Sequence, residues 1–254
     1  MEHFRDSPLE QARIADLFGL IPERGARALD VGARDGFLSL RLAERYDSVV
    51  ALDLEKPQID HPRIECVAAN AAALPYADDS FDLVLCSEVL EHIPRPAMDA
   101  ACREIVRVAS GPIVIGVPLQ QDLRIAETTC SHCGHHNPPW GHVNSFTEHE
   151  LGRLFSPAFP VRQNFVGTSR DRTCALAVDL LRYAGNPFGT YLQDETCLSC
   201  DQPIGQPGSR TLPQRIATRC ATLLNSLLSA TMAERPMWIH VLYSKSAADS
   251  AGKA

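Results

Sequence analysis

Short apolar runs alternate with amphipathic or turn-rich segments along most of the chain. Seven short runs have the length of strands, and most of them are rich in Val, Ile and Leu. They span 27–31, 49–53, 64–68, 83–87, 113–117, 161–165 and 238–243. Because helical or turn segments separate them, the pattern predicts an α/β fold built on a doubly wound sheet.

Four other segments repeat their apolar residues at helical spacing. They cover 7–20, 97–109, 148–155 and 213–232. Ser7 before Pro8 is a helix-start signal, and Thr147 with Glu150 has the spacing of a capping box. The segment between the second and third strands is short and contains two prolines, so we expect no regular helix there.

Composition sets modest bounds on function. The 254 residues are 45% hydrophobic and 22% charged, which is ordinary for a globular protein. The formal net charge of −7 disfavours a nucleic-acid substrate, because phosphate backbones would be repelled. No apolar run is long enough to span a membrane, and the first residues lack a signal peptide's pattern. We therefore expect a cytoplasmic protein.

The first predicted strand runs into a turn of small residues. Gly32 and Gly36 flank this turn, and the second strand ends at Asp53. Glycine lets the backbone approach a ligand closely, and a carboxylate after the second strand can bind ribose hydroxyls, although simple solvation of the strand end is the alternative. A dinucleotide fold requires G-x-G-x-x-G, and Arg34 interrupts that pattern here. Hydride-transfer chemistry is therefore disfavoured.

This turn resembles motif I of the class I S-adenosylmethionine-dependent methyltransferases, of the type 11-like group. Asp30, Gly32 and Gly36 match the pattern acidic-x-Gly-x-Gly-x-Gly, whereas Arg34 stands at the middle glycine. Later segments resemble, in the same order, the family's adenine loop, fourth strand and following helix; they are 70–71, 74–87 and 88–93. The resemblance implies a Rossmann-like seven-stranded sheet of order 3-2-1-4-5-7-6 with the last strand antiparallel.

The resemblance also implies a cofactor, S-adenosylmethionine, and a set of residues that bind it. Gly32 and Gly36 would hold the methionyl end, Asp53 the ribose, and Asn70 with Ala71 the adenine. Arg34 would either offset the methionyl carboxylate or pair with a neighbouring aspartate. The predicted cofactor-binding residues are Asp30, Gly32, Ala33, Arg34, Gly36, Asp53, Leu54, Asn70, Ala71, Ser87 and Glu88.

Direct methyl transfer needs a base only when the acceptor starts protonated. His92 is our first candidate for this catalytic role and His142 the second, because histidine titrates near neutral pH. His92 could equally cap or pack a helix end. In the family the first helix, 7–20, often covers the cofactor or shapes the acceptor site, but plain packing on the sheet is the alternative.

Two C-x-x-C pairs predict a metal site. Cys130 with Cys133 and Cys197 with Cys200 offer four thiolates, the set typical of tetrahedral structural zinc. A disulfide is disfavoured in a reducing compartment, and redox chemistry would need only one pair. Four cysteines favour a closed, non-catalytic site, although nearby histidines could substitute as ligands; they are His132, His135 and His136. We expect the other five cysteines to be ordinary buried thiols.

The loop between the two pairs contains Trp140, His142 and Phe146. One interpretation is that Trp140 and His142 form a wall that faces the acceptor. The alternative is that Trp140 and Phe146 fill a small core beside the zinc, and we favour this alternative for Phe146. Segment 213–232 is strongly amphipathic with few basic residues, so we expect it to dock on the fold or on a second subunit rather than on a membrane.

The expected organisation is a single domain over 1–254. Insertions at 119–146 and 168–212 would form the zinc-bound region, and 245–254 would be a disordered tail. The leading functional hypothesis is a small-molecule O-, N- or C-methyltransferase with structural zinc, for which 213–232 is the candidate homodimer contact. The alternatives are a catalytically silent cofactor-binding or scaffold protein, and an RNA or protein methyltransferase that docks its partner through the zinc region.

Overall fold

The computed structural model describes residues 6–191 and 195–245, in two compact units. The first, which we call the sheet unit, comprises the described residues up to Leu119, then Phe146–Gly167, and those from Pro236 onwards. The second, the cysteine unit, comprises Gln120–Ser145 and the described residues within Thr168–Arg235. From residue 246 onwards the expected disordered tail lies outside the described residues.

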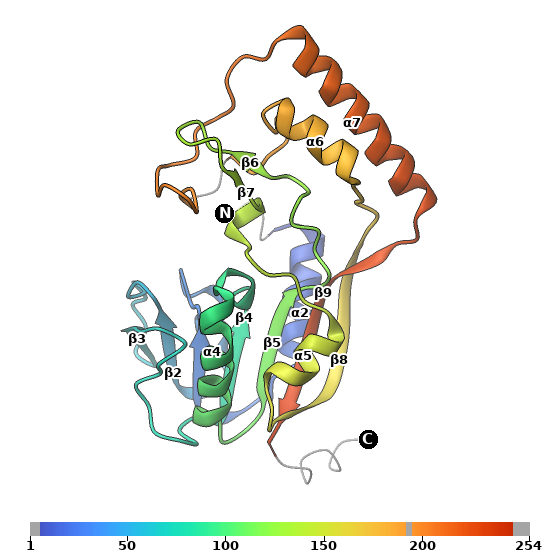
Figure 1. Cartoon of the computed structure of the whole chain (residues 1–254). Coiled ribbons are helices and arrows are strands. Elements are labelled where there is room, and N and C mark those ends of the chain that lie inside the picture. Colours follow the sequence, from blue (N-terminus) through green and yellow to red (C-terminus); the bar gives the residue numbers. More distant parts are fainter. Residues whose placement is uncertain (1–5, 192–194, 246–254) are drawn as a thin grey trace. The chain divides into compact units, whose positions relative to one another are not determined.

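A seven-stranded sheet forms the centre of the sheet unit (Figure 1). Its strands are β1 (Gly25–Val31), β2 (Tyr46–Asp53), β3 (Ile64–Ala68), β4 (Leu83–Ser87), β5 (Ile113–Pro118), β8 (Phe159–Ser169) and β9 (Arg235–Ser244). They lie in the order β3-β2-β1-β4-β5-β9-β8, and β9 runs antiparallel to β5. Counted along the chain, this is the predicted order 3-2-1-4-5-7-6, so the fold prediction is confirmed.

The sheet register brings three strand ends together. Val31 at the end of β1 pairs with Leu52 of β2 on one side and with Cys86 of β4 on the other. All three strands are parallel, so their carboxyl ends open at one edge. In open α/β sheets ligands bind outside this edge, where the strand order reverses. The residues that follow β1, β2 and β4 are therefore neighbours.

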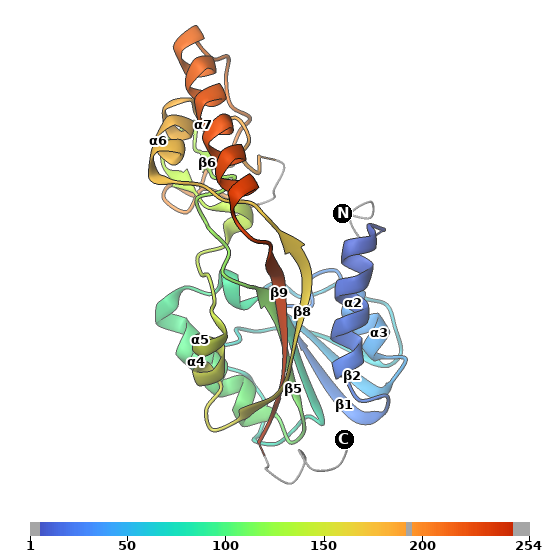
Figure 2. The ribbon, with the colours of Figure 1, turned by 90° about the vertical axis from the view of Figure 1, so that its right-hand side faces the viewer.

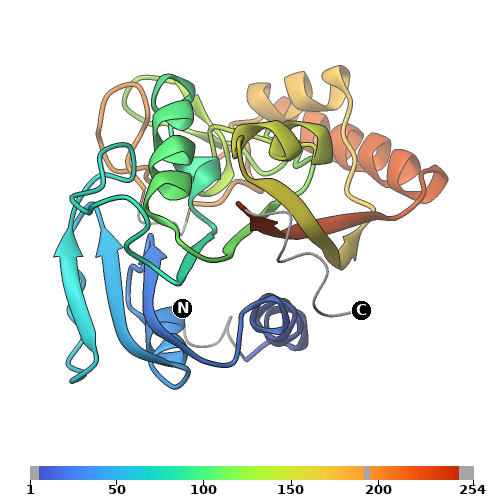
Figure 3. The ribbon, with the colours of Figure 1, turned by 90° about the horizontal axis from the view of Figure 1, so that it is seen from below.

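Helices cover both faces of the sheet (Figures 2 and 3). One face carries α2 (Pro8–Leu20) and α3 (Phe37–Leu42), and the other carries α4 (Arg95–Val108) and α5 (Glu148–Leu154). Leu17 and Leu42 are fully buried in the first core layer, and Cys102, Ile105 and Phe146 in the second. Burial of the large aliphatic side chains in these two layers is the main stabilising contribution in the unit.

The structure confirms the predicted helix starts and the predicted absence of a helix between β2 and β3. Ser7 caps α2 by accepting a hydrogen bond of 3.2 Å from the backbone N–H of Glu10. Thr147 and Glu150 form both hydrogen bonds of a capping box at α5. Residues 54–63, between β2 and β3, contain no helix. A three-residue helix, η1 (Leu90–His92), follows β4.

The cysteine unit contains a short hairpin and two packed helices. The hairpin pairs β6 (Thr128–Thr129) with β7 (His136–Asn137), and the turn η2 (Pro139–Gly141) follows it. The helices are α6 (Ala175–Tyr183) and α7 (Leu212–Thr231). Our sequence analysis missed α6. Its start has no side-chain cap, and no acidic residue in its first turn marks it.

The small residues of α7 face inward and its large ones face outward. Ala217, Thr218 and Ala221 are buried, whereas Ile216 is 53% and Leu223 61% exposed. Small side chains let helices approach closely, which explains their place in the packed face. Docking on the fold, one of the two expected alternatives, therefore does not hold for the outward residues of α7, and docking on a second subunit stays a prediction. These outward residues are Leu212, Ile216, Leu223 and Leu227.

Two of the five remaining cysteines match the expectation of buried thiols. Cys86 and Cys102 are fully buried, and Cys66 and Cys174 are half-buried. Cys220 is exposed because it lies on the outward side of α7, so the expectation is wrong there. Among the described helices, none is both long enough and apolar enough to cross a lipid bilayer.

Candidate functional site

The turn after β1 is tied to the end of β2 by backbone hydrogen bonds. The N–H groups of Gly32 and Ala33 both donate to the carbonyl oxygen of Leu52, at 2.7 and 3.0 Å. The carboxylate of Asp53 accepts from the backbone N–H of Arg34 at 2.8 Å and from that of Leu54 at 2.7 Å. Two donors thus orient Asp53, and its remaining lone pairs can accept ligand hydroxyls.

Three residues of this turn adopt left-handed backbone conformations. Gly32 has φ of 78°, Arg34 of 49° and Gly36 of 80°. A Cβ on Gly32 would lie 2.2 Å from Val89, and one on Gly36 would lie 2.2 Å from Ile59. Neighbouring side chains of the protein therefore leave no room for a Cβ at either glycine. The sequence analysis explained both glycines only by the close approach of a ligand. Arg34 takes up the conformation that glycine favours at the family's middle position.

Asp30 points into the protein. It is 2% exposed and accepts a 2.6 Å hydrogen bond from the hydroxyl of Ser39. Burial raises the pKa of Asp30 to about 6, although the bond from Ser39 opposes this shift. The side chain links the end of β1 to α3, so it braces the turn from inside.

The predicted adenine loop is anchored by an arginine that our sequence analysis did not single out. Arg107 of α4 donates to the carbonyl oxygens of Leu74 and Tyr76, at 3.1 and 2.7 Å. Glu104 accepts from the backbone N–H of Leu74 at 2.8 Å. At the start of the loop, the Asn70 side-chain oxygen accepts a 2.9 Å bond from the N–H of residue 72, so this oxygen has a local partner.

A polar network lies at the carboxyl end of β4. Ser87 is buried and accepts a 3.3 Å hydrogen bond from Arg13 of α2. The next residue, Glu88, is in the left-handed region with φ of 57° and accepts a 3.3 Å bond from the indole N–H of Trp238 on β9. Burial raises the pKa of Glu88 to about 6, and the positive charge of Arg13 opposes that shift. No pattern in the sequence predicted that Trp238 and Arg13 would lie at the end of β4.

The two candidate bases lie in different units. His92 is exposed, at the end of η1 in the sheet unit. His142 is buried in the cysteine unit, where its Nδ1 lies 2.6 Å from the side-chain oxygen of Gln121. Beside His92, Glu91 is fully buried, and neither of its carboxylate oxygens has a hydrogen-bond partner among the described residues. Both histidines stay predictions.

The four predicted cysteine ligands come together in the cysteine unit. Their sulfur atoms lie within 4.8 Å of one another, with 3.7 Å between those of Cys130 and Cys200 and 3.7 Å between those of Cys133 and Cys197. A zinc ion with sulfur ligands at about 2.3 Å in tetrahedral geometry separates them by about 3.8 Å. The four residues therefore fit zinc.

The two cysteine turns have the same backbone construction. The N–H of Gly134 donates to the carbonyl of Cys130, and that of Asp201 donates to the carbonyl of Cys197, both at 2.9 Å. Gly134 and Asp201 each have positive φ, of 75° and 53°. Burial raises the pKa of the Cys197 thiol, but nearby backbone N–H donors outweigh this and lower it to about 6. A thiolate is therefore accessible at neutral pH, as metal binding requires.

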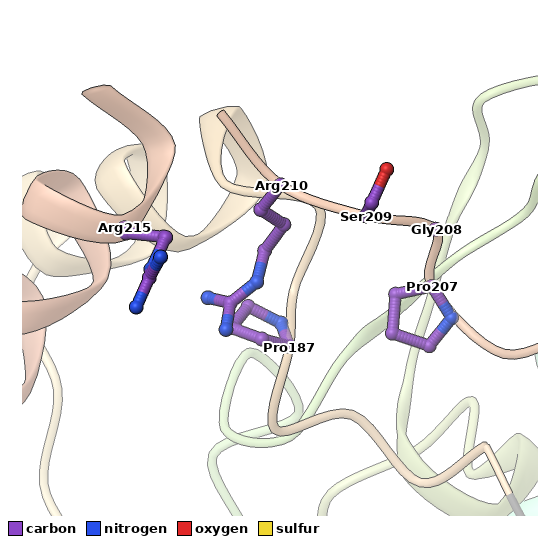
Figure 4. Close-up of a pocket in the computed structure, with 6 residues that line it drawn as sticks. All are labelled: Pro187, Pro207, Gly208, Ser209, Arg210 and Arg215. Atoms are coloured by element: carbon purple, nitrogen blue, oxygen red, sulfur yellow. The ribbon is translucent and has the colours of Figure 1, made fainter. Parts of the chain in front are cut away.

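The cysteine unit also contains a hollow (Figure 4). Its volume is about 460 Å³ and it is lined by Pro187, Pro207, Gly208, Ser209, Arg210 and Arg215. The guanidinium group of Arg210 donates a 2.8 Å hydrogen bond to Thr218 on α7. None of the predicted cofactor, catalytic or metal residues lines this hollow.

Comparison with known proteins supports the sequence motifs. Residues 29–111 match a family model described as a methyltransferase domain. A ubiquinone biosynthesis O-methyltransferase from Paracidovorax citrulli is 31% identical over 107 residues, covering 37% of this chain and 45% of that protein. A demethylmenaquinone methyltransferase from Renibacterium salmoninarum is 36% identical over 109 residues, covering 40% and 44%. The chain thus spans less than half the length of these curated relatives.

Solved structures share the fold at low identity. A methyltransferase-like protein of Bacillus halodurans, described as a putative methyltransferase, has a TM-score of 0.57 at 14% identity and covers 91% of this chain and 98% of its own. The [4+2]-cyclase SpnF has a TM-score of 0.51 at 16% identity, with coverage of 94% and 84%. Residues 29–111 thus resemble a methyltransferase domain, and the sheet order is the one that the class I methyltransferase resemblance implies.

Proposed function

We propose that this protein is an S-adenosylmethionine-dependent methyltransferase that acts on a small-molecule acceptor and carries structural zinc in its cysteine unit. The observation that carries the proposal is the Asp53 carboxylate, which two backbone N–H groups orient beside the turn after β1. Leu54, next to it, is 73% exposed and offers an apolar surface for a purine. These features fit a nucleoside.

The cofactor supplies a methyl group already activated by a positively charged sulfur, so the protein mainly positions the reactants. Asp53 would hold the ribose hydroxyls, and the backbone at Gly32, Ala33 and Gly36 would border the methionyl part. Leu54, Asn70 and Ala71 would border adenine. We keep His92 and His142 as proposed bases for acceptors that start protonated.

The metal part of the proposal rests on the sulfur geometry. Four cysteines leave zinc no open position, so its role would be to hold the two cysteine turns together rather than to act on substrate. Such a site needs reduced thiols, which agrees with the reducing cytoplasm that we expect for this chain.

The relatives' names support a small acceptor, because one is a ubiquinone biosynthesis O-methyltransferase and another a demethylmenaquinone methyltransferase by name. The net charge of −7 speaks against nucleic acid as the acceptor. We also propose a homodimer through 213–232, because α7 exposes large apolar side chains that water contacts unfavourably.

Calorimetric titration with S-adenosylmethionine and S-adenosylhomocysteine tests the proposal directly. We expect both to bind, and we expect Asp53→Asn to weaken both by roughly tenfold or more, since it removes a charged acceptor of hydroxyl hydrogen bonds. Asp47→Asn is the matched control, because Asp47 is an exposed aspartate at the opposite end of β2. Thermal unfolding of each variant checks that the fold persists.

The outcomes separate the alternatives. If neither ligand binds the wild-type protein, the methyltransferase proposal is wrong. If both bind but no methyl group is transferred to any of a panel of small molecules, proteins and RNA, the silent cofactor-binding alternative gains support. SpnF, a cyclase by name, illustrates that this fold alone does not determine the reaction.

A further inference from the structure

Charged side chains gather beside Glu88 within the sheet unit. Arg13 and Glu10 of α2 are 7% and 6% exposed and form two short hydrogen bonds with each other, of 2.8 and 2.6 Å. Arg13 also reaches Glu88, but its Nη1 atom lies 3.7 Å from the Oε1 atom. Trp238 donates to the other oxygen of Glu88. Arg13 is therefore paired mainly with Glu10 and only loosely with Glu88.

This cluster carries an excess of negative charge. Glu10 and Glu88 bring two carboxylates, and Arg13 brings the single guanidinium between them. Oε1 of Glu88 is buried and has no hydrogen-bond partner among the described residues. Burial raises the pKa of the nearby Glu91 well above its ordinary value, and the Glu88 carboxylate raises it further. Burying a carboxylate without a full opposite charge beside it costs free energy, and a bound cation would reduce that cost.

The backbone presents Glu88 at the proposed cofactor site. Its N–H donates to the carbonyl of Gly116 at 2.9 Å, which helps to hold the strained left-handed conformation. The following residue, Val89, occupies the space where a Cβ of Gly32 would lie. Glu88 is thus adjacent to the turn after β1. Its side chain is 32% exposed although Oε1 itself is buried, so a ligand can reach part of the side chain.

We infer that the Glu88 carboxylate is the counter-charge for the sulfonium group of S-adenosylmethionine, and that it lets the protein bind the charged cofactor in preference to the neutral product S-adenosylhomocysteine. The inference rests on the proposed function. Weaker binding of the neutral product would favour its release after methyl transfer. Arg13 is a positioning residue that acts through its charge: at 3.7 Å from Oε1 it favours the ionised form of Glu88.

The test compares the dissociation constants of the two ligands, by calorimetry at pH 7.5. The measured quantity is the ratio of the constant for S-adenosylhomocysteine to that for S-adenosylmethionine. We expect Glu88→Gln to lower this ratio by roughly tenfold, because the two ligands differ by one charge at short range. Glu44→Gln removes the same charge at an exposed carboxylate between α3 and β2 and should leave the ratio within about twofold.

Each outcome decides a separate point. If both ligands bind and Glu88→Gln weakens them equally, this inference is wrong and the proposed function stands. If neither ligand binds the wild-type protein, the proposed function and this inference fall together. Glu88→Asp keeps the charge and should retain a ratio above that of Glu88→Gln; an equal loss in both variants, with thermal unfolding unchanged, would contradict a role for charge.

A pH series tests the part assigned to Arg13. The groups that face Glu88 are Arg13 and Glu10 from α2, Glu91 from η1 and Trp238 from β9. In the wild-type protein the ratio should fall as the pH drops through about 6, where Glu88 becomes protonated. Arg13→Met should move this midpoint upward by about one pH unit, because a neighbouring cation is lost. A merely structural role would leave the midpoint unchanged, and that result would exclude a positioning role.

Discussion

Asp30 shows how burial changes the meaning of a motif residue. It matches the acidic position of the family's first motif, yet it is 2% exposed and accepts a hydrogen bond from the Ser39 hydroxyl inside the protein. Burial disfavours its charged form and raises its pKa from 3.8 to about 6. Its contribution to stability must therefore depend on pH.

The sign of that dependence follows from linkage. Because the folded-state pKa is raised, the stability due to neutral Asp30 is complete below about pH 4 and is lost as the pH rises through about 6. The loss amounts to roughly 3 kcal/mol, at about 1.4 kcal/mol per pKa unit. Asp30→Asn stays neutral, so urea unfolding from pH 4 to 7.5 should show a smaller decline than in the wild type. Parallel pH profiles for the two proteins would contradict this account.

At the scale of elements, side chains from helices decide how the loops at the strand ends are held. Arg107 of α4 holds the loop after β3 by donating hydrogen bonds to two of its backbone carbonyls. An ion pair with Glu104 at 2.7 Å orients the arginine. Outward residues of α7 have the opposite character, because no described residue of their unit covers them. One helix thus fixes a loop, and the other presents a surface.

Removal of the Arg107 anchor should destabilise the loop. We expect Arg107→Ala to lower the free energy of unfolding by roughly 2 kcal/mol, because several hydrogen bonds to a charged group are lost together. Hydrogen exchange at the Leu74 N–H should also accelerate. Arg103→Ala on the same helix is the control, since Arg103 is exposed and should change stability by no more than about 0.5 kcal/mol. Equal effects of both substitutions would refute the anchoring role.

The outward face of α7 gives a prediction about association. If this face joins two copies, Leu223→Asp should convert the dimer to monomer, because it buries a charge in an apolar contact. Thr222→Asp adds the same charge next to the stripe on an exposed residue and should leave the dimer intact. Sedimentation velocity over a concentration series measures both. A wild-type protein that stays monomeric at high concentration would show that the proposed dimer is wrong.

At the scale of the whole molecule, the two units are stabilised by different means. Extensive aliphatic layers on both faces of the sheet stabilise the sheet unit. The small buried cluster around the cysteines contains only four buried residues, Cys130, Tyr191, Cys197 and Ile204. So small a core supplies little burial energy, and a metal that holds the cysteines would compensate for it.

Metal analysis tests this division. Protein purified without chelators should contain about one zinc per chain, and Cys197→Ser should reduce the content to less than half of that. Cys220→Ser is the control, because it removes an exposed thiol outside the cluster. After chelation, limited proteolysis should cut within the cysteine unit first. Full wild-type zinc content in Cys197→Ser would show that this cysteine is not a ligand.

Much of the fold could be predicted from the sequence because it depends on neighbours along the chain. The seven apolar runs, the capped starts of α2 and α5 and the two cysteine pairs are local patterns, and the structure contains all of them. The order of the strands came from the family resemblance, which the matched domain supports. The cluster of small residues after the first apolar run also predicted the turn that follows β1.

Only the tertiary structure decided which distant residues meet. Sheet order brings Trp238 of β9 and Arg13 of α2 to Glu88, and packing places Val89 and Ile59 against the two glycines. The direction in which α7 faces was likewise set by its contact with α6, not by its amphipathic pattern. Hydrophobic periodicity records that a face is apolar, but the partner of that face depends on contacts between segments far apart in the chain.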